Sequence, residues 1–479
     1  MQEQLIGRQK EQEILQKAWT SKRAEMVAII GRRRVGKTFL VRSFFKGKFD
    51  FEITGIQNAP QKEQLKNFKL QLEKFADPTL PIEQPKDWLD AFVLLIRHLE
   101  SLEKSKRKIV FLDELPWLAT NRSGFLRALG YFWNSWADQQ NIVVVICGSA
   151  ASWMIQKVVN HKGGLHNRIT KRIFLKPFNL PETEHFLKSR EVFLDRYQIL
   201  QLYMAMGGIP HYLGEVEAGL SATQNIDQIC FSDNGMLRGE FSRLYPALFE
   251  NSDNHIEIIR ALARKNSGLT RQELITQTRF SDGGGLTKIL QELDASGFIS
   301  SYYPFGKKKR KLLYRLTDEY SLFYLYFIEN KVHEEENIWQ KLSQTQSWKT
   351  WSGYAYENIC LKHIPEIKKS IGISGVYSES AAFYYKATEE IDGAQIDLVI
   401  DRNDHVINLF EIKFYNEEFV LTKDYASKLR KKMGVFRQVT KTKKQLFYMV
   451  ITTFGLKKNS HSLGLVHKAL DLDDLFENI

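Results

Sequence analysis

The stretch MVAIIGRRRVGKTFLVRSFF, residues 26–45, decides the fold of the amino-terminal part of this chain. Its first five residues are apolar and predict a buried strand, and FLVRSFF at its end has the character of a helix. Between them GRRRVGKT, residues 31–38, satisfies the pattern G-x-x-x-x-G-K-[S/T] of a phosphate-binding loop. Glycine at both ends lets the backbone wrap around phosphates, and the N–H groups that open the helix supply positive potential. A glycine-containing surface turn is the alternative, but the flanking strand and helix argue against it.

The residue types of this loop predict a site for a nucleoside triphosphate and Mg²⁺. Lys37 is expected to reach the β and γ phosphates, and the Thr38 hydroxyl is expected to coordinate the metal. The residues expected to surround ATP are Gly31, Arg32, Arg33, Arg34, Val35, Gly36, Lys37, Thr38 and Phe39. The three successive arginines make the loop unusually basic, which would serve phosphate affinity or only solubility.

A second motif, KIVFLDEL at residues 108–115, places two acidic residues after an aliphatic strand. Ligands of an open α/β sheet bind at the carboxyl ends of its strands. Asp113 there suits the binding of Mg²⁺, and Glu114 suits a general base for the attacking water. An acidic pair in this place is, taken alone, more often a helix cap. Together with the phosphate-binding loop it predicts an ATPase that converts ATP and water to ADP and phosphate.

Short aliphatic runs alternate with amphipathic stretches up to about residue 180, which predicts a parallel sheet covered by helices on both faces. The five runs are MVAII (26–30), FDFEIT (49–54), KIVFL (108–112), NIVVVI (141–146) and RIFL (172–175). We expect an α/β P-loop NTPase fold in which the run 141–146 lies between the strands of the two motifs. Ser149, after this run, is then a candidate for sensing the γ-phosphate, or else a routine helix cap.

The segment KGGLHNRITKRIFLKPF, residues 162–178, carries two arginines ahead of and within the last strand. An arginine delivered to the γ-phosphate, from the same chain or from a neighbouring subunit, can supply much of the catalysis in such enzymes. Arg168 is the first candidate and Arg172 the second. Both residues as plain surface arginines are the alternative.

These motifs resemble those of the AAA+-like ATPases of archaea and bacteria, which are related to signal-transducing NTPases and origin-recognition ATPases. The resemblance includes IGRQKE (6–11) and AMGGIPHYL (205–213). It implies that Gly7 and Arg8 lie near the adenine and ribose, and that the glycine and proline of the second segment close a lid. The implied organisation is an ATPase core at residues 1–180 and a helical lid at 181–250.

Residues 251–328 have the pattern of a winged helix. IEIIRALA (256–263), LTRQELITQT (269–278) and LTKILQELDASGFI (286–299) read as three helices, the second opened by a capping box of Thr270 and Glu273. A β-hairpin follows, and its tip consists of Lys307, Lys308, Lys309, Arg310 and Lys311. Such a wing would grip DNA phosphates. Winged helices also act as lids or protein-docking modules.

The last segment, residues 329–479, resembles the PD-(D/E)xK nuclease-like fold that accompanies the same ATPases as a domain of unassigned function. Glu411 and Lys413 lie two apart in a predicted strand and share a face, and a turn near Asn403 would bring Asp397 opposite them. The carboxylates would bind a second Mg²⁺ or Mn²⁺ while Lys413 acts on the phosphate or on water, and Glu357 would complete the cluster. The alternatives are an exposed cross-strand ion pair, or a fold that has lost its chemistry.

The net charge, the cysteines and the apolar runs of the whole chain indicate its partners and its location. Lysine and arginine exceed aspartate and glutamate by 68 − 56 = 12, which favours an anionic partner such as DNA. The 479 residues contain three scattered cysteines, Cys147, Cys230 and Cys360, and no apolar run long enough to span a membrane. These features predict a cytoplasmic protein with no membrane partner, and a homo-oligomer is left open.

The function expected from the sequence is an ATP-driven switch coupled to a DNA-binding winged helix and a nuclease-like output domain. Two alternatives remain. One is a regulator or scaffold whose nuclease-like domain is inactive, and the other is an ATPase that remodels proteins.

Overall fold

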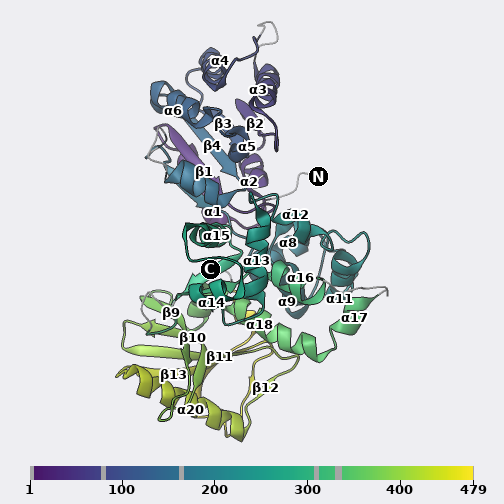
Figure 1. Cartoon of the computed structure of the whole chain (residues 1–479), viewed down its shortest axis with the longest axis vertical. Helices are drawn as coiled ribbons and strands as arrows, with labels where there is room; N and C mark the ends of the chain where they lie inside the picture. The colour runs from purple at the N-terminus through teal and green to yellow at the C-terminus, as the bar shows by residue number, and fades with distance from the viewer. Residues whose placement is uncertain are drawn as a thin grey trace. The chain divides into compact units, whose positions relative to one another are not determined.

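The computed structural model describes residues 5–76, 82–160, 165, 167–306, 312–329 and 337–477. The chain divides into two compact units: Met1–Pro177 with Leu248–Glu250, and Phe178–Ala247 with Asn251–Ile479 (Figure 1). The boundary expected after residue 180 lies close to the first junction, and the one expected after residue 328 lies inside the second unit. Within the described ranges, no helix has the length and apolar character needed to cross a membrane.

The first unit is built on a five-stranded parallel sheet. Its strands are β1 (Glu25–Ile30), β2 (Phe51–Thr54), β3 (Lys108–Asp113), β4 (Ile142–Gly148) and β5 (Lys171–Phe174). Their order is β2-β3-β4-β1-β5, and every neighbouring pair is parallel. β1, β3 and β4 are buried along their whole length, which explains their unbroken apolar runs. The predicted parallel α/β fold is confirmed, with β4 between the strands of the two motifs.

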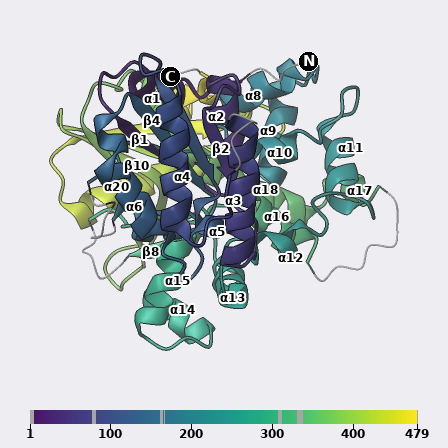
Figure 2. The same ribbon diagram turned by 90° about the horizontal axis from the view of Figure 1, so that it is seen from above.

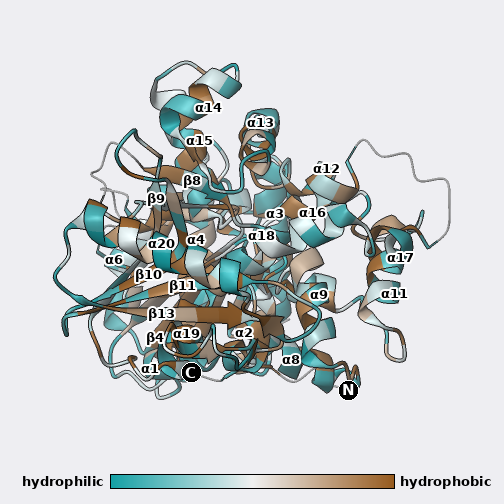
Figure 3. Ribbon diagram, turned by 90° about the horizontal axis from the view of Figure 1, so that it is seen from below, coloured by the Kyte–Doolittle hydropathy of each residue, from teal (hydrophilic) through white to brown (hydrophobic). Residues whose placement is uncertain are grey.

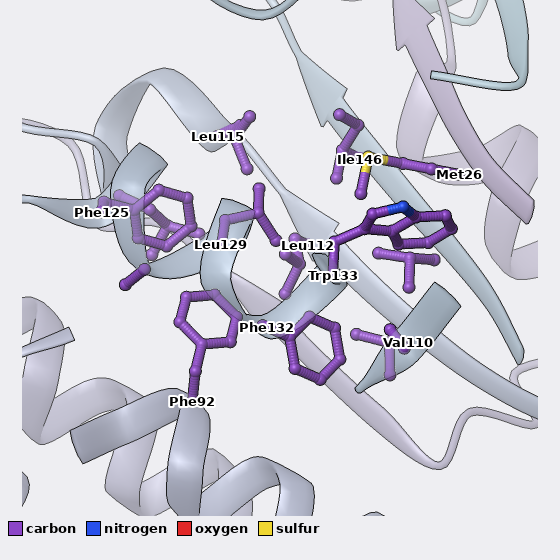
Figure 4. Close-up of a cluster of buried hydrophobic side chains, with 14 of the residues drawn as sticks. Met26, Phe92, Val110, Leu112, Leu115, Phe125, Leu129, Phe132, Trp133 and Ile146 are labelled. Atoms are coloured by element: carbon purple, nitrogen blue, oxygen red, sulfur yellow. The ribbon is translucent and has the colours of Figure 1, made fainter. Parts of the chain in front are cut away.

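Helices cover both faces of this sheet. They are α1 (Gln9–Trp19), α2 (Lys37–Phe44), α3 (Gln61–Phe75), α4 (Trp88–Ser101), α5 (Leu115–Leu118), α6 (Phe125–Ser135), η1 (Ala137–Gln139), α7 (Ala151–Trp153) and η2 (Met154–Val159). α3 and α4 run side by side (Figure 2), and with α6 they bury one sheet face. Phe92 and Phe132 stack there with ring centroids 5.3 Å apart, in the same cluster as Val110 and Ile146 (Figure 4). α1 and α2 contact β1, β4 and β5 with side chains outside that cluster.

The second unit begins with helices where a lid was expected. They are α8 (Leu180–Ser189), α9 (Arg196–Met206), α10 (Pro210–Leu213), α11 (Ala222–Ile226), η3 (Asp227–Phe231) and α12 (Glu240–Leu244). The Phe178 amide donates to the Gly208 carbonyl at 2.7 Å. A Cβ on Gly208 would lie 1.9 Å from the Phe178 carbonyl oxygen, so only glycine fits this crossing.

Residues 252–327 form helices around a small antiparallel sheet. The elements are α13 (Ser252–Ala263), β6 (Leu269–Thr270), α14 (Arg271–Gln277), α15 (Gly284–Ala295), β7 (Ile299–Tyr302), β8 (Leu313–Leu316) and α16 (Glu319–Phe327), with strand order β6-β8-β7. The predicted capping box of Thr270 and Glu273 is formed. Figure 3 shows hydrophobic and hydrophilic residues alternating along α14 and α15, as in amphipathic helices. The basic residues 307–311 lie outside the described residues.

The carboxyl-terminal part contains a second, mixed sheet of order β15-β13-β11-β10-β9. Its elements are α17 (Ile338–Leu342), α18 (Gln346–Lys362), α19 (Ile364–Ser370), β9 (Ser378–Tyr385), β10 (Ala394–Arg402), β11 (Val406–Lys413), β12 (Phe419–Val420), α20 (Lys423–Thr440), β13 (Gln445–Thr452), β14 (Leu456–Lys457), β15 (Val466–Leu470) and α21 (Leu472–Leu475). α20 packs Leu429 and Phe436 into a core with Val399 and Leu409 of the sheet.

Candidate functional site

The phosphate-binding loop is held between β1 and α2 by close backbone packing. The Leu175 amide donates to the Ile30 carbonyl at 2.7 Å, and a Cβ on Gly31 would lie 2.4 Å from the Leu175 carbonyl oxygen. Arg34 and Gly36 adopt left-handed backbone angles, with φ of 72° and 89°. These turns close the loop so that α2 begins at Lys37 and its first N–H groups face the loop interior.

The two sequence motifs meet at a hydroxyl–carboxylate pair. Thr38 Oγ1 donates to Asp113 Oδ2 at 2.8 Å, although the residues are 75 apart in the chain. Lys37 is buried and its Nζ donates to the Arg32 carbonyl at 2.9 Å, so that its ammonium group lies over the loop. Hydroxyl and carboxylate oxygens beside a lysine are the donor set that suits Mg²⁺ on a triphosphate.

Glu114 follows Asp113 in a constrained position. Its backbone is left-handed, with φ of 50°, and its amide donates to Asp113 Oδ1 at 3.0 Å. Glu114 Oε2 accepts two hydrogen bonds from Ser149, at 3.0 Å from the amide and 2.8 Å from Oγ. The tip of β4 therefore orients the carboxylate at the edge of the sheet. Ser149, predicted as a phosphate sensor, here donates both hydrogen bonds to Glu114.

The amino-terminal segment lies against the phosphate-binding loop. The buried Arg8 donates from Nη2 to the Val35 carbonyl at 3.3 Å. Gln12 Nε2 donates to the Gly7 carbonyl at 2.8 Å, which links Gly7 to the first helix. These contacts place Gly7 and Arg8 beside the loop. Of the other loop residues, Arg32 is buried, Arg33 is half-buried and Phe39 is exposed.

Arg168, the first candidate arginine of residues 162–178, lies far from its own phosphate-binding loop. The Thr170 amide donates to the Met26 carbonyl at 2.9 Å, so that Arg168 lies level with the start of β1, whereas the loop follows its end. Four residues of strand separate the two levels, about 13 Å at 3.3 Å per residue. Arg168 and Arg172 are both exposed. The structure does not bring Arg168 to the phosphate site of the same chain, and Arg172 pairs with Ala28 of β1.

In the second unit, β10 and β11 form the predicted hairpin. Leu398 pairs with Phe410, which places Asp397 opposite Glu411 at the next position. Asp397 Oδ2 accepts a hydrogen bond from the Ile412 amide at 3.0 Å. The acid pair and Lys413 are thus brought together at the end of β11.

Glu411 is buried, and cations and tyrosines surround its carboxylate. Lys413 Nζ lies 3.0 Å from Oε1 and Lys432 Nζ 2.7 Å from Oε2. The hydroxyls of Tyr425 and Tyr448 also donate to this carboxylate. Burial raises the pKa of Glu411, but Lys413 and Lys432 outweigh it and hold the pKa below its usual value. Lys432 and Tyr425 were not among the predicted site residues, although their spacing of seven puts them on one face of α20.

The other two carboxylates have different surroundings. Burial raises the pKa of Asp397 to about 7, and the charges of Glu411 and Glu357 add to this effect. Glu357 is bound by Arg315 Nη2 at 2.9 Å. Across the residues the structure describes, no group of three or more His, Cys, Asp or Glu side chains is arranged to hold a metal. The expected three-carboxylate metal cluster is therefore not assembled, because lysines engage Glu411 and an arginine engages Glu357.

Comparison with known proteins agrees with the nucleotide site. Residues 5–216 match the model of an ATPase domain found predominantly in Archaea. An uncharacterized protein of Methanocaldococcus jannaschii is 24% identical over 413 residues, 85% of this chain and 87% of the relative. An uncharacterized ATP-binding protein of the same archaeon is 40% identical over 43 residues, 9% of this chain and 73% of the relative.

Two solved structures are also similar. The Walker-type ATPase of Pyrococcus abyssi has a TM-score of 0.48 and 17% identity, over 67% of this chain and 96% of that one. The ORC2 protein of Aeropyrum pernix, solved with ADPNP and ADP, has a TM-score of 0.42 and 15% identity, over 67% of this chain and 93% of that one. The family match covers the whole nucleotide site, from Gly7 to Ser149, and extends through α10. Residues 5–216 of this chain therefore match an ATPase domain found predominantly in Archaea, and the phosphate-binding loop lies within that match.

Proposed function

We propose that the chain is an ATP-hydrolysing switch whose second unit binds nucleic acid. Hydrolysis rests on one observation: Ser149 holds the Glu114 carboxylate one residue beyond Asp113, which is itself bonded to Thr38. Thr38 and Asp113 would hold Mg²⁺, which neutralises charge on the triphosphate when bound. Lys37 stabilises the charge that develops on the phosphate oxygens, and Glu114 orients water and accepts its proton.

The test for hydrolysis is Glu114→Gln. The amide keeps the size of the side chain and an acceptor for Ser149 but cannot take a proton. We expect ATP to bind as in the parent while turnover falls by about 100-fold or more. Glu63→Gln, an exposed change in the same unit, is the control. Turnover that survives in Glu114→Gln would refute the assignment of the base.

The proposed coupling runs through the helices between α8 and α12. Within the second unit, hydrogen bonds and an ion pair join them to the carboxyl-terminal part. The Leu180 amide donates to His363 Nε2 at 3.0 Å, Asn179 Nδ2 to Glu366 at 3.2 Å, and Arg196 to Asp473 at 2.8 Å. A nucleotide-dependent movement of these helices would carry the β9–β11 sheet with it.

A nucleic-acid partner is supported by charge and by element order. The order α13, α14, α15, β7, β8 is that of a winged helix, and the chain carries a net charge of +12. Residues 423–444 contain nine basic side chains and one acidic one. On α20, Lys423, Arg430 and Arg437 recur every seven residues on its exposed face, about 10 Å apart along the axis. Such a row suits the phosphate backbone.

We propose further that the Asp397–Glu411 site binds nucleic acid without cutting it. The reason is that two lysines already neutralise Glu411, the residue a metal-dependent nuclease would use as a ligand. A nuclease assay with Mg²⁺ or Mn²⁺ should give the same background for the parent and for Glu411→Gln. Metal-dependent cleavage in the parent that the variant loses would instead favour the second candidate, an active nuclease.

For Arg168 we propose action only in a neighbouring copy, because its own loop is beyond reach. The ATPase rate per chain should then rise with protein concentration, and Arg168→Ala should abolish that rise. A rate per chain that does not change with concentration would remove Arg168 from the mechanism.

A further inference from the structure

A cavity of about 860 Å³ opens beside the acid pair of the second unit. Asp397 and Lys413 both line it. Its walls come from α9, α11, α17, α18, β10 and the segment that follows β11. The helices of the expected lid thus share a cavity with the carboxyl-terminal sheet.

Aromatic rings form much of the wall. Phe414, the residue after Lys413, lies 5.8 Å from the Tyr197 ring at an angle of 19°, and 6.3 Å from Trp348 at 85°. Tyr354 and Tyr415 also line the cavity and are 40% and 41% exposed. Large exposed rings around a cavity are a platform for stacking a flat ligand.

The polar groups of the wall match the polar groups of a nucleotide. The side-chain amides of Gln201, Gln395 and Asn416 offer both donors and acceptors, and Lys349 and Lys413 offer positive charge. A nucleotide presents a flat base, a polar base edge and a phosphate. The wall also contains three acidic side chains: Glu357, which is bound by Arg315, Asp397, which accepts a hydrogen bond from the Ile412 amide, and the exposed Glu417.

We propose that this cavity accepts an unpaired base at the end of a single-stranded nucleic acid, with a flanking phosphate next to Lys413. The inference rests on the proposed function, that the second unit binds nucleic acid. A base within a duplex cannot enter, because its faces are stacked and its edge is paired. The cavity therefore selects single strands over blunt duplexes.

Gly353 provides a way to block the cavity without disturbing the fold. It lies in the middle of α18 and lines the cavity, and a Cβ there would meet nothing within 4 Å. Leucine at this position has a higher helix propensity than glycine and would project into open space. Gly375 has equally open surroundings outside the cavity, so Gly375→Leu is the matched control.

The experiment measures binding of the full chain to a short labelled single strand and to a blunt duplex of the same sequence. Gly353→Leu and Tyr354→Ala should weaken single-strand binding by about tenfold or more, the value of one stacked base. Duplex binding should change less than about twofold. Gly375→Leu and Phe193→Ala, the latter at an exposed ring outside the cavity, should match the parent for both ligands.

The outcomes separate the two proposals. A parent that binds neither ligand would refute the proposed function itself. A parent that binds both, with Gly353→Leu and Tyr354→Ala binding the single strand as well as the parent does, would overturn the cavity assignment alone.

Discussion

The nucleotide site of the first unit and the acid pair of the second use the same residue types with different partners. In the first, Asp113 accepts a hydrogen bond from the Thr38 hydroxyl and Glu114 accepts two from Ser149. In the second, Glu411 lies between two lysine ammonium groups. Neutral donors orient a carboxylate and leave its charge available to a metal or a proton. Cationic partners neutralise that charge. The hydrogen-bond and ion-pair partners of a carboxylate therefore decide whether it can bind a metal or take a proton.

The largest effect we expect is the loss of ATP turnover when the nucleotide site of the first unit is changed. Lys37→Ala removes the ammonium group that lies over the loop, and ATP turnover should fall by about 1,000-fold or more, with weakened nucleotide binding. Calorimetric titration with ATP and a phosphate-release assay measure this change. Lys48→Ala, an exposed lysine after α2, should behave as the parent. ATP binding and turnover preserved in a folded Lys37→Ala would show that the loop is not the nucleotide site.

The second prediction concerns Asp397 and the pH dependence of stability. Burial raises its pKa from 3.8 to about 7 in the folded chain, so the folded state binds more protons than the unfolded state between these values. The free energy of unfolding therefore falls as the pH rises from about 4 to 7, by at most about 4 kcal/mol. Asp397→Asn should remove this fall, and thermal unfolding at pH 5 and pH 8 measures it.

Because His363 also titrates, the free energy of unfolding of Asp397→Asn must be compared with that of the parent at each pH. Burial lowers the pKa of His363 to about 4, so this group acts with the opposite sign, losing stability as the pH falls below about 6.5. The contribution of His363 is common to parent and variant, and it cancels in the difference. Glu418→Gln, an exposed carboxylate, should leave the pH profile unchanged. A profile for Asp397→Asn that parallels the parent would show that Asp397 is ionised in the folded state throughout this range.

A third, smaller effect tests whether the second unit carries the nucleic-acid contacts. Substituting Lys423, Arg430 and Arg437 of α20 together by glutamine should weaken duplex binding by about 100-fold at 0.1 M salt. The slope of log K against log salt should fall by about 2.7, since each lost phosphate contact contributes about 0.9. Filter binding across a salt series measures both values. ATP turnover without DNA should not change.

The matched control for α20 is a change of equal charge in the first unit. Glutamine at the exposed Lys10, Lys17 and Lys62 lowers the net charge by the same amount at other positions. If this control weakens duplex binding as strongly as the α20 triple variant, the affinity follows net charge and α20 is not a specific surface.

The first site could be predicted from the sequence because its signals are local. The G-x-x-x-x-G-K-T pattern needs only eight consecutive residues, and the three fully buried strands β1, β3 and β4 are visible as apolar runs. The position of β4 between β1 and β3 followed from fold resemblance. The hairpin that sets Asp397 opposite Glu411 was predictable too, because alternation and a polar turn fix its register.

Tertiary contacts were beyond the sequence. Nothing local indicates that Ser149 would bond to Glu114, or that Lys432 from α20 would reach Glu411 across 21 residues. The distance of Arg168 from its own loop follows from the register of β5 on β1, which the sequence does not state. Side-chain partners decide protonation and charge, so the chemistry of the second site could not be read from its residue types.

The smallest effect concerns Ser149, whose contact defines the difference between the two sites. Ser149→Ala removes the 2.8 Å hydroxyl bond to Glu114 and keeps the 3.0 Å amide bond, so the carboxylate should lose part of its orientation. A hydrogen bond to a charged group contributes about 1.5–3 kcal/mol, and with one of two donors left we expect about a tenfold fall in ATP turnover. ATP affinity should stay as in the parent, because Ser149 supports the base. Ser152→Ala, in the same turn but bonded to Gln156, is the control. A loss of ATP affinity without loss of turnover in Ser149→Ala would instead identify this hydroxyl as a contact of the phosphate.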